Sequence, residues 1–286
     1  MIMKSHSKNI IEGKLPVVKG DAHHIRMIEN YQDDDAHSTI VQSIEDVPVI
    51  DFQQYMGQDE NSQSVKDMCQ LVAESFHKYG ILIVRDPRAK EEENDEYIDI
   101  MEKYFDSRGK IYYAGEKLEE EKPECHFLVG VTPEGQEHAR PHEARIKAYD
   151  DENRPMSPLE PVPDAKWRFL WKIGERLPGA SDNFDQVIPP DFPDWEEKMD
   201  RWGNKLLAAV QVVAEMAAIG MGVEKDAFTK RMVGGSQLLA PTGSDLHKHG
   251  VGTVLAGYHY DIAFLTIHGK SRYPGLYVWT REDQKL

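Results

Sequence analysis

The sequence predicts an α+β fold, in which a region of helices and mixed structure precedes a strand-rich region. Three observations support this. A β-α-β pattern occupies residues 47–84, and the strongest helical periodicity of the chain covers residues 195–221. Several short β-prone runs, separated by turn signals, follow near the end of the chain. We therefore divide the chain into a polar N-terminal extension (1–45), an N-terminal α/β and supporting-helix region (46–230) and a strand region (231–286).

Composition narrows the class of protein and of partner. The 286 residues are 40% hydrophobic and 29% charged, which is typical of a globular protein with a sizeable core. No apolar run approaches the ~20 residues of a membrane-spanning helix, and the N-terminus lacks the apolar core of a signal peptide. Cys69 and Cys125 lie far apart, so we expect a reducing, cytoplasmic setting. The net charge of −16 argues against nucleic acid as a partner.

The first elements follow from local periodicity. Residues 1–45 are polar, and we interpret the His23-His24 pair as part of a solvated extension rather than a metal site. Residues 47–52 are typical of an edge strand, because a proline stands near their start. Residues 64–79 form one apolar stripe of a helix, which Gly80 is placed to end, and residues 81–84 are typical of a buried strand.

The middle of the chain is less regular. Residues 90–105 predict a helix with three glutamates in its first turn, where negative charge is favourable. Residues 116–194 contain many prolines, which exclude long regular elements. Within them Trp167, Phe169 and Trp171 alternate, as expected for a strand with one aromatic face. The helix at 195–221 has an apolar stripe of core type, formed by Trp195, Met199, Trp202, Leu206, Val210, Val213 and Ala217.

Four short strands are predicted in the last region, at 236–241, 253–258, 264–268 and 275–280. The second of them leads into His259 and Asp261, which form a His-x-Asp pair. Two residues apart on extended backbone, both side chains point to the same side, so an imidazole and a carboxylate can hold adjacent positions on one metal ion. A second histidine from elsewhere would complete a facial triad of the kind that binds non-haem Fe(II).

The motif has a family context. The run His259-Tyr-Asp261, then Phe264-Leu-Thr-Ile267, then Pro274-Gly-Leu-Tyr-Val278 resembles the iron-binding core of the 2-oxoglutarate/Fe(II)-dependent dioxygenases. Within that superfamily it is most similar to the branch that contains isopenicillin N synthase. Residues 47–52 and 79–84 are similar to the opening of the same family, whereas residues 90–230 match only in general layout.

The resemblance implies a fold, a cofactor and a reaction. The fold is a double-stranded β-helix (jelly-roll, cupin-like) core, here truncated, behind an N-terminal helical and mixed layer. His259 and Asp261 would bind Fe(II), with 2-oxoglutarate as cosubstrate. The reaction would be an O₂-dependent hydroxylation, or a related oxidation, of a small-molecule substrate. No membrane or nucleic acid would take part.

The sequence also departs from the family pattern. The family's third ligand is a histidine several tens of residues after His-x-Asp, followed by an Arg-x-Ser that binds 2-oxoglutarate. The sequence ends at Leu286, His268 is too close to be that ligand, and neither Arg272 nor Arg281 stands in an Arg-x-Ser. Ala240 stands where many relatives have a tyrosine that touches the cosubstrate. We therefore expect the 286 residues alone to bind Fe(II) weakly and to be inactive until native downstream sequence completes the site.

Further residues are assigned to the site by position. Phe264, Thr266 and His268 alternate along a predicted strand and are expected to face the pocket. His247 and His249 lie in a polar loop that is expected to line the mouth of the site. Two alternative functions remain open. One is a non-catalytic, oxygenase-derived scaffold or binding protein, and the other is a cupin-like metal protein that uses His247, His249 and His259.

Overall fold

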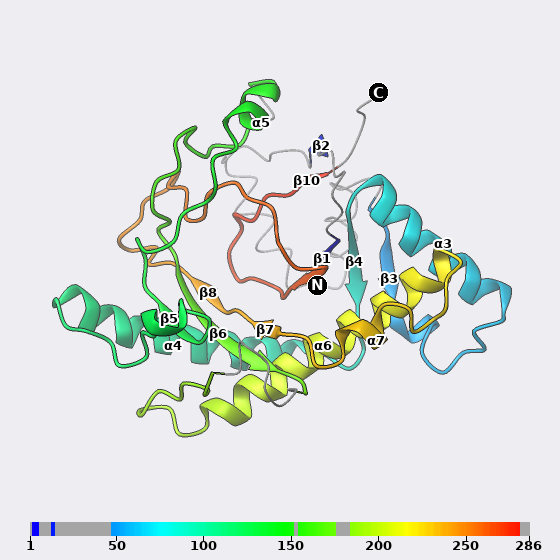
Figure 1. The fold of residues 1–286 in the computed structure, drawn as a ribbon, viewed down its shortest axis with the longest axis horizontal. Helices are drawn as coiled ribbons and strands as arrows, with labels where there is room; N and C mark the ends of the chain where they lie inside the picture. Colours follow the sequence, from blue (N-terminus) through cyan, green and yellow to red (C-terminus); the bar gives the residue numbers. More distant parts are fainter. Residues whose placement is uncertain (1, 6–12, 15–46, 152–153, 176–183, 281–286) are drawn as a thin grey trace.

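The computed structural model describes residues 2–5, 13–14, 47–151, 154–175 and 184–280. Two sheets share one long helix, α6 (Trp195–Gly220), which runs beneath both of them in Figure 1. Helix α3 (Gln63–Lys78) packs along the C-terminal half of α6, and α4 (Glu91–Tyr113) packs on its N-terminal half. The architecture is a mixed α+β fold, as the sequence predicted.

The first sheet confirms the predicted β-α-β opening. Its strand order is β3-β4-β1-β9, where β3 is Val49–Asp51, β4 is Ile81–Arg85, β1 is Ile2–Ser5 and β9 is Leu265–His268. Strands β3 and β4 are parallel and connected through α3, which ends before Gly80 at a φ of 76°. Strand β1 is antiparallel to both of its neighbours, so the start of the chain joins two segments that are far apart in sequence.

The second sheet is antiparallel and lies over the N-terminal half of α6. Its order is β5-β6-β7, where β5 is Gly130–Thr132, β6 is Trp167–Ile173 and β7 is Gln237–Leu239, and β8 (Thr242–Gly243) also pairs with β6. The predicted aromatic strand is β6, and its three alternating aromatic side chains are all buried. The remaining elements are short: η2 (Phe52–Gln54), η3 (Pro123–Cys125), α5 (Glu143–Ala148), α7 (Thr229–Met232), β2 (Gly13–Lys14) and β10 (Trp279–Thr280), of which the last two pair.

The core consists of two main clusters that α6 connects. One cluster joins α3, β3 and β4 to the C-terminal half of α6, around fully buried residues such as Cys69 and Val213. The other joins α4 and β6 to the N-terminal half, where Trp195 lies among Tyr104, Phe169 and Phe192. Each fully buried large side chain contributes roughly 1.5–3 kcal/mol, so the packing on the two faces of α6 stabilises the fold substantially.

A buried ion pair fixes the loop after α4. The Arg108 guanidinium bonds Glu120 at 2.6–2.7 Å, and both side chains are almost fully buried. The same guanidinium lies over the rings of Tyr104 and Phe192. Because a buried charge without its partner is costly, loss of either residue would release the loop that leads into β5.

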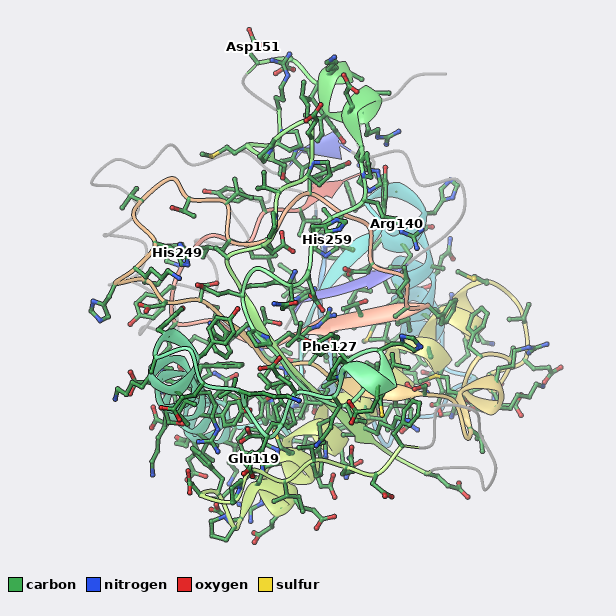
Figure 2. The ribbon with its side chains drawn as sticks, turned by 60° about the vertical axis from the view of Figure 1, so that its left-hand side comes forward. Glu119, Phe127, Arg140, Asp151, His249 and His259 are labelled. Atoms are coloured by element: carbon green, nitrogen blue, oxygen red, sulfur yellow. The ribbon has the colours of Figure 1, made fainter. Side chains whose placement is uncertain are left out.

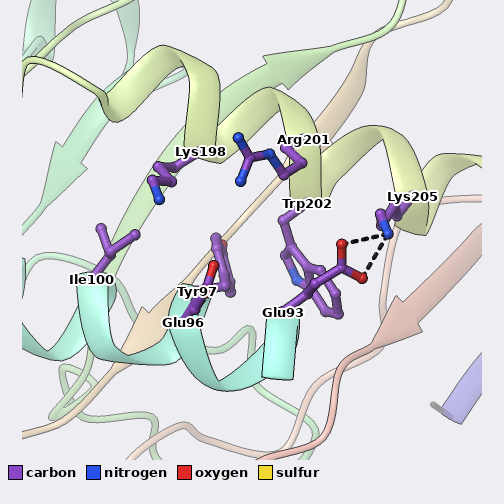
Figure 3. Close-up of a pocket in the computed structure, with 8 residues that line it drawn as sticks. All are labelled: Glu93, Glu96, Tyr97, Ile100, Lys198, Arg201, Trp202 and Lys205. Atoms are coloured by element: carbon purple, nitrogen blue, oxygen red, sulfur yellow. Dashed lines mark hydrogen bonds and ion pairs between the residues drawn. The ribbon is translucent and has the colours of Figure 1, made fainter. Parts of the chain in front are cut away.

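Helices α4 and α6 also border a shallow pocket on their outer side (Figure 3). There Lys205 pairs with Glu93, and Tyr97 stacks on Trp202 with ring centroids 5.7 Å apart. The rest of the lining consists of Glu96, Ile100, Lys198 and Arg201. Among the described helices, none combines the length and apolar character that crossing a bilayer requires.

Two predicted strands are wrong. Residues 253–258 bend instead of pairing, because the amides of Gly257 and Tyr258 donate to side chains and not to a neighbouring strand. Of residues 275–280, only Trp279–Thr280 pairs. Residues 2–5 and 13–14 also differ from a purely solvated extension, since their backbones pair with β4, β9 and β10. His23-His24 lies outside the described residues.

The predicted roll is not assembled from residues 231–286 alone. Strands β7 and β8 pair with β6, while β9 pairs with β1 and β10 with β2, so in each described pair the partner comes from elsewhere. The helical layer does lie under these strands, with α6 in contact with both β7 and β9. A closed double-stranded β-helix is not resolved in this strand order, and that part of the prediction remains a prediction.

The crossing of α3 and α6 predicts a strong effect of one methyl group. A Cβ atom on Gly220 would stand 2.0 Å from the carbonyl oxygen of Cys69, so the helices would have to separate. We expect Gly220→Ala to lower the free energy of unfolding by about 2–3 kcal/mol, measured by urea denaturation.

The matched control is the same substitution in α4. A Cβ on Gly109 would meet only the Tyr113 ring, at 3.4 Å, and alanine favours the helix. Gly109→Ala should therefore raise stability by about 0.5–1 kcal/mol. Equal effects at both positions would contradict the close crossing.

Candidate functional site

His259 and Asp261 lie in the bent segment that connects β8 to β9, and their side chains converge. The Nε2 atom of His259 lies 3.6 Å from Oδ1 of Asp261. The predicted same-side orientation is therefore present, although the backbone is a bent loop and not a strand. Asp261 is the more buried of the two, while half of the His259 side chain is exposed.

A backbone hydrogen bond fixes the orientation of the His259 ring. Its Nδ1 atom lies 2.7 Å from the carbonyl oxygen of Gly257. A carbonyl oxygen only accepts hydrogen bonds, so Nδ1 carries the hydrogen and, in the neutral ring, Nε2 keeps its lone pair. Metal-binding histidines are commonly held in this way, with one ring nitrogen bonded to an outer partner and the other directed at the metal ion.

His268 approaches Asp261 from the other side. Its Nε2 atom lies 3.9 Å from Oδ2 of Asp261 and is shut off from solvent. Among the described residues this nitrogen has no hydrogen-bond partner. Burying such a group has a cost, so a buried imidazole nitrogen directed at a carboxylate marks a place where a bridging atom would be favourable.

Strand parity places the other predicted pocket residues. Leu265 and Ile267 pack against the core on the helical side of β9, so Thr266 and His268 point to the opposite side. Phe264 precedes the strand and is about half exposed, and its ring lies 5.1 Å from that of Phe228. Phe264 therefore packs beside α7 and does not continue the alternation that was predicted for it with Thr266 and His268.

An aromatic group borders His259. Tyr258 is buried, with its ring 5.3 Å from Trp279 and 5.6 Å from His142. His142 also meets Tyr260 edge-on at 5.0 Å. Burial, together with the nearby guanidinium groups of Arg140 and Arg145, lowers the pKa of His142 below its usual 6.5. His142 is therefore neutral at pH 7 and acts as an aromatic packing partner.

His247 and His249 have different environments from the one predicted. His247 is exposed, whereas Nε2 of His249 lies 2.7 Å from Oε2 of the buried Glu134. Lys248 pairs with the other Glu134 oxygen and lies over the ring of Tyr113. Burial raises the pKa of Glu134, but the hydrogen bonds from Lys248, His249 and Tyr113 outweigh it and lower that pKa below the usual 4.5.

These contacts fasten the 245–249 loop to the turn that follows β5, and they leave the cupin-like ligand set unassembled. His249 and His259 lie apart in Figure 2. Within the described ranges, no three His, Cys, Asp or Glu side chains are placed to hold a metal ion together. The structure thus brings together His259, Asp261 and His268, at spacings wider than those of adjacent ligands on one ion. Arg272 is engaged elsewhere, with Asp99 and Glu102 of α4.

Sequence reasoning missed the residues that support the site. Asp164 accepts the amide hydrogen of Gly257 at 2.8 Å, and Ser157 accepts that of Tyr258 at 2.5 Å. Both acceptors come from the proline-rich segment, about a hundred positions upstream. No local signal marks them, because an Asp and a Ser in a loop are ordinary turn residues.

The comparisons with known proteins concern the fold alone. No protein-family model matches the chain, and no curated protein matches it. Its structure is similar to that of a putative 2OG-Fe(II) oxygenase family protein from Caulobacter crescentus, at 20% identity and a TM-score of 0.47, over 72% of this chain and 60% of that one. A full-length Neurospora crassa protein in complex with alpha-KG aligns at 17% identity and a TM-score of 0.43, over 64% and 49%.

A C-terminal truncated form of the same Neurospora crassa protein, in its apo form, aligns at 15% identity and a TM-score of 0.40, over 68% of this chain and 61% of that one. The chain therefore spans about half to three-fifths of the length of these proteins. What this chain binds has to be argued from its own residues.

The Glu134 cluster predicts an acid-sensitive contribution to stability. Because the pKa of Glu134 is lowered in the folded state, its contribution is full above pH 4.5 and is lost as the pH falls through the folded-state value. We expect Glu134→Gln to lower the unfolding free energy by about 1–2 kcal/mol at pH 6 and by clearly less at pH 3.

Urea denaturation at the two pH values measures this difference. Glu143→Gln is the control, since the Glu143 side chain is exposed and pairs with Lys147 one helical turn away, and it should change stability by less than about 0.5 kcal/mol at either pH. A Glu134→Gln effect that is independent of pH would contradict the charged network.

The close approach of two loops predicts a rescue. A Cβ on Gly257 would lie 3.0 Å from that of Ala139, so Gly257→Ala should destabilise the protein by about 1 kcal/mol. Ala139→Gly removes the opposing methyl, and the double variant should recover most of that loss in a double-mutant cycle. Additive losses would show that the two loops do not touch.

Proposed function

We propose that the protein is a non-haem Fe(II) oxygenase that uses 2-oxoglutarate, with His259 and Asp261 as two of the iron ligands. The observation that carries the proposal is the hydrogen bond from Nδ1 of His259 to the Gly257 carbonyl. It leaves the Nε2 lone pair directed into the space that Asp261 also faces, at 3.6 Å. An imidazole nitrogen and a carboxylate oxygen are a donor set that suits Fe(II).

The buried Nε2 atom of His268 supports the same site. It faces Asp261 without a hydrogen-bond partner among the described residues, at a distance too long for a direct hydrogen bond. With Fe(II) bound, His259 and Asp261 would hold the ion, and His268 would either join them or orient the Asp261 carboxylate. Bound Fe(II), together with 2-oxoglutarate, would supply the O₂ chemistry that side chains lack.

The chain's own residues would then hold and shield the site. Gly257 and Asp164 keep the His259 ring in place, and the ring of Tyr258 closes one side of the segment with Trp279. Thr266, on the His268 side of β9, is the side chain best placed to border a small substrate. Cytoplasmic location and a small-molecule substrate belong to the same proposal.

One observation favours a second candidate, a non-catalytic binding protein on the same fold. Among the described residues, no third ligand stands at coordination distance, and Arg272 is paired with α4 and cannot serve a cosubstrate carboxylate. A protein of this kind would bind a metal ion or a small molecule without turnover.

Metal titration tests the ligand assignment. We expect His259→Ala and Asp261→Ala each to weaken Co(II) or Fe(II) binding at least about tenfold, since loss of a ligand costs no less than loss of its outer partner. His247→Ala is the matched control, because His247 is an exposed histidine of the neighbouring loop, and it should leave affinity unchanged. Equal affinity in all three variants would overturn the site.

Succinate formation from 2-oxoglutarate separates the two candidates. The 286-residue chain is compared with the same chain carrying its native downstream sequence, where one follows. Turnover that His259→Ala abolishes supports the oxygenase. Turnover by the 286 residues alone would mean that a residue within them, first of all His268, completes the ligand set. Metal binding without succinate in any form would favour the binding protein.

A further inference from the structure

We propose that Asp164 is a positioning residue for His259, acting through the backbone of Gly257. Two hydrogen bonds in series connect them. Oδ1 of Asp164 accepts the amide hydrogen of Gly257 at 2.8 Å, and the carbonyl oxygen of Gly257 lies 2.7 Å from Nδ1 of His259. The carboxylate thereby fixes the amide side of Gly257. The carbonyl that selects the ring tautomer belongs to the next peptide, and the amide of that peptide, on Tyr258, donates to Ser157 at 2.5 Å. The consequence for metal binding rests on the proposed function, whereas the effect on the tautomer does not.

Asp164 is itself held from every side, as a positioning group must be. Its side chain is only 6% exposed, its amide donates to the Glu137 carbonyl at 2.7 Å, and its own carbonyl accepts from the Gly135 amide at 2.9 Å. The second carboxylate oxygen pairs with Lys166. An acceptor fixed in this way at both backbone and side chain offers a single direction to the Gly257 amide.

A second anchor acts on the next residue. Ser157 accepts the amide hydrogen of Tyr258 at 2.5 Å, and the Tyr258 ring is buried against Trp279 and His142. Two successive amides that a strand would have paired with a neighbour are bonded to side chains instead. The turn that presents His259 is therefore shaped by the proline-rich segment.

The competing interpretation is that Asp164 only staples two loops together through its ion pair. A substitution at Glu137 distinguishes this interpretation from the positioning role. Glu137 is a carboxylate of the same cluster and pairs with both Lys166 and Arg168, whereas the Gly257 amide donates to Asp164. Removing the Glu137 charge disturbs the ion pairs and leaves the bond to the Gly257 amide in place.

The experiment compares Asp164→Ala, Asp164→Asn and Glu137→Gln in the full chain. The first measurement is ¹⁵N NMR of the histidine rings in metal-free protein, with His259 assigned by its absence in His259→Ala. We expect the Nδ1–H form in wild type and in Glu137→Gln. Asp164→Ala should shift His259 towards the Nε2–H form that free histidine prefers in water. Asp164→Asn should lie between wild type and Asp164→Ala, because its one oxygen can accept from the Gly257 amide only while its NH₂ group faces Lys166.

The second measurement is the Co(II) dissociation constant of the same proteins. Asp164→Ala should weaken binding about 10–100-fold, as expected for an outer partner of a metal ligand, and Asp164→Asn should recover part of it. Should Asp164→Ala fail to fold, Asp164→Leu takes its place, because leucine keeps the side-chain volume and offers no acceptor to the Gly257 amide.

Three results would overturn the inference. One is an unchanged tautomer in Asp164→Ala. Another is an equal effect of Glu137→Gln, which would show a structural staple. The third is a loss in Asp164→Ala of which Asp164→Asn recovers no part. If His259→Ala leaves Co(II) affinity unchanged, the proposed metal site fails, and the NMR result still decides whether Asp164 positions the ring.

Discussion

The burial of α6 on two faces is the constraint on which the rest of the structure depends. Its C-terminal half packs against α3 and the first sheet, and its N-terminal half packs against α4 and the second sheet. Ile267 of β9 touches both clusters, so the strand next to the candidate site is fixed by the same helix. The close crossings need glycine at Gly203 and Gly220, where a methyl group would overlap neighbouring atoms.

The candidate site is built differently from the core. Its backbone is irregular, and side chains of a distant loop satisfy its amides. Irregular backbone next to a rigid scaffold is where binding residues commonly lie, because a loop can aim a side chain in a direction that a strand cannot. Here the result is a histidine with a defined tautomer beside a partly buried carboxylate. This arrangement is described by its own hydrogen bonds and distances, independently of any family resemblance.

The parts of the fold that the sequence predicted are those that local periodicity determines. Four elements are of this kind: α3, α6, β6 and β4. In each of them the spacing of the apolar residues, read over a short stretch of sequence, identifies the side that is buried. Residues 253–258 have the composition of a strand, but their hydrogen bonds are decided by Asp164 and Ser157. In the site, the spacing of His259 and Asp261 predicted that their side chains converge, and they do so on loop backbone where a strand was expected. The approach of His268 and the capture of His249 by Glu134 depend on tertiary packing, which no spacing reveals.

The position of β1 bears on how the protein is made. In the first sheet β1 lies between β4 and β9, so one neighbour of β1 is translated about 260 residues after it. At usual elongation rates roughly 15–50 s separate the two, and during that time one edge of β1 has no partner. Pairings this distant in sequence are slow to form and leave strand edges exposed. A nascent chain of this kind would be a natural client for a chaperone that shields extended segments until β9 has emerged.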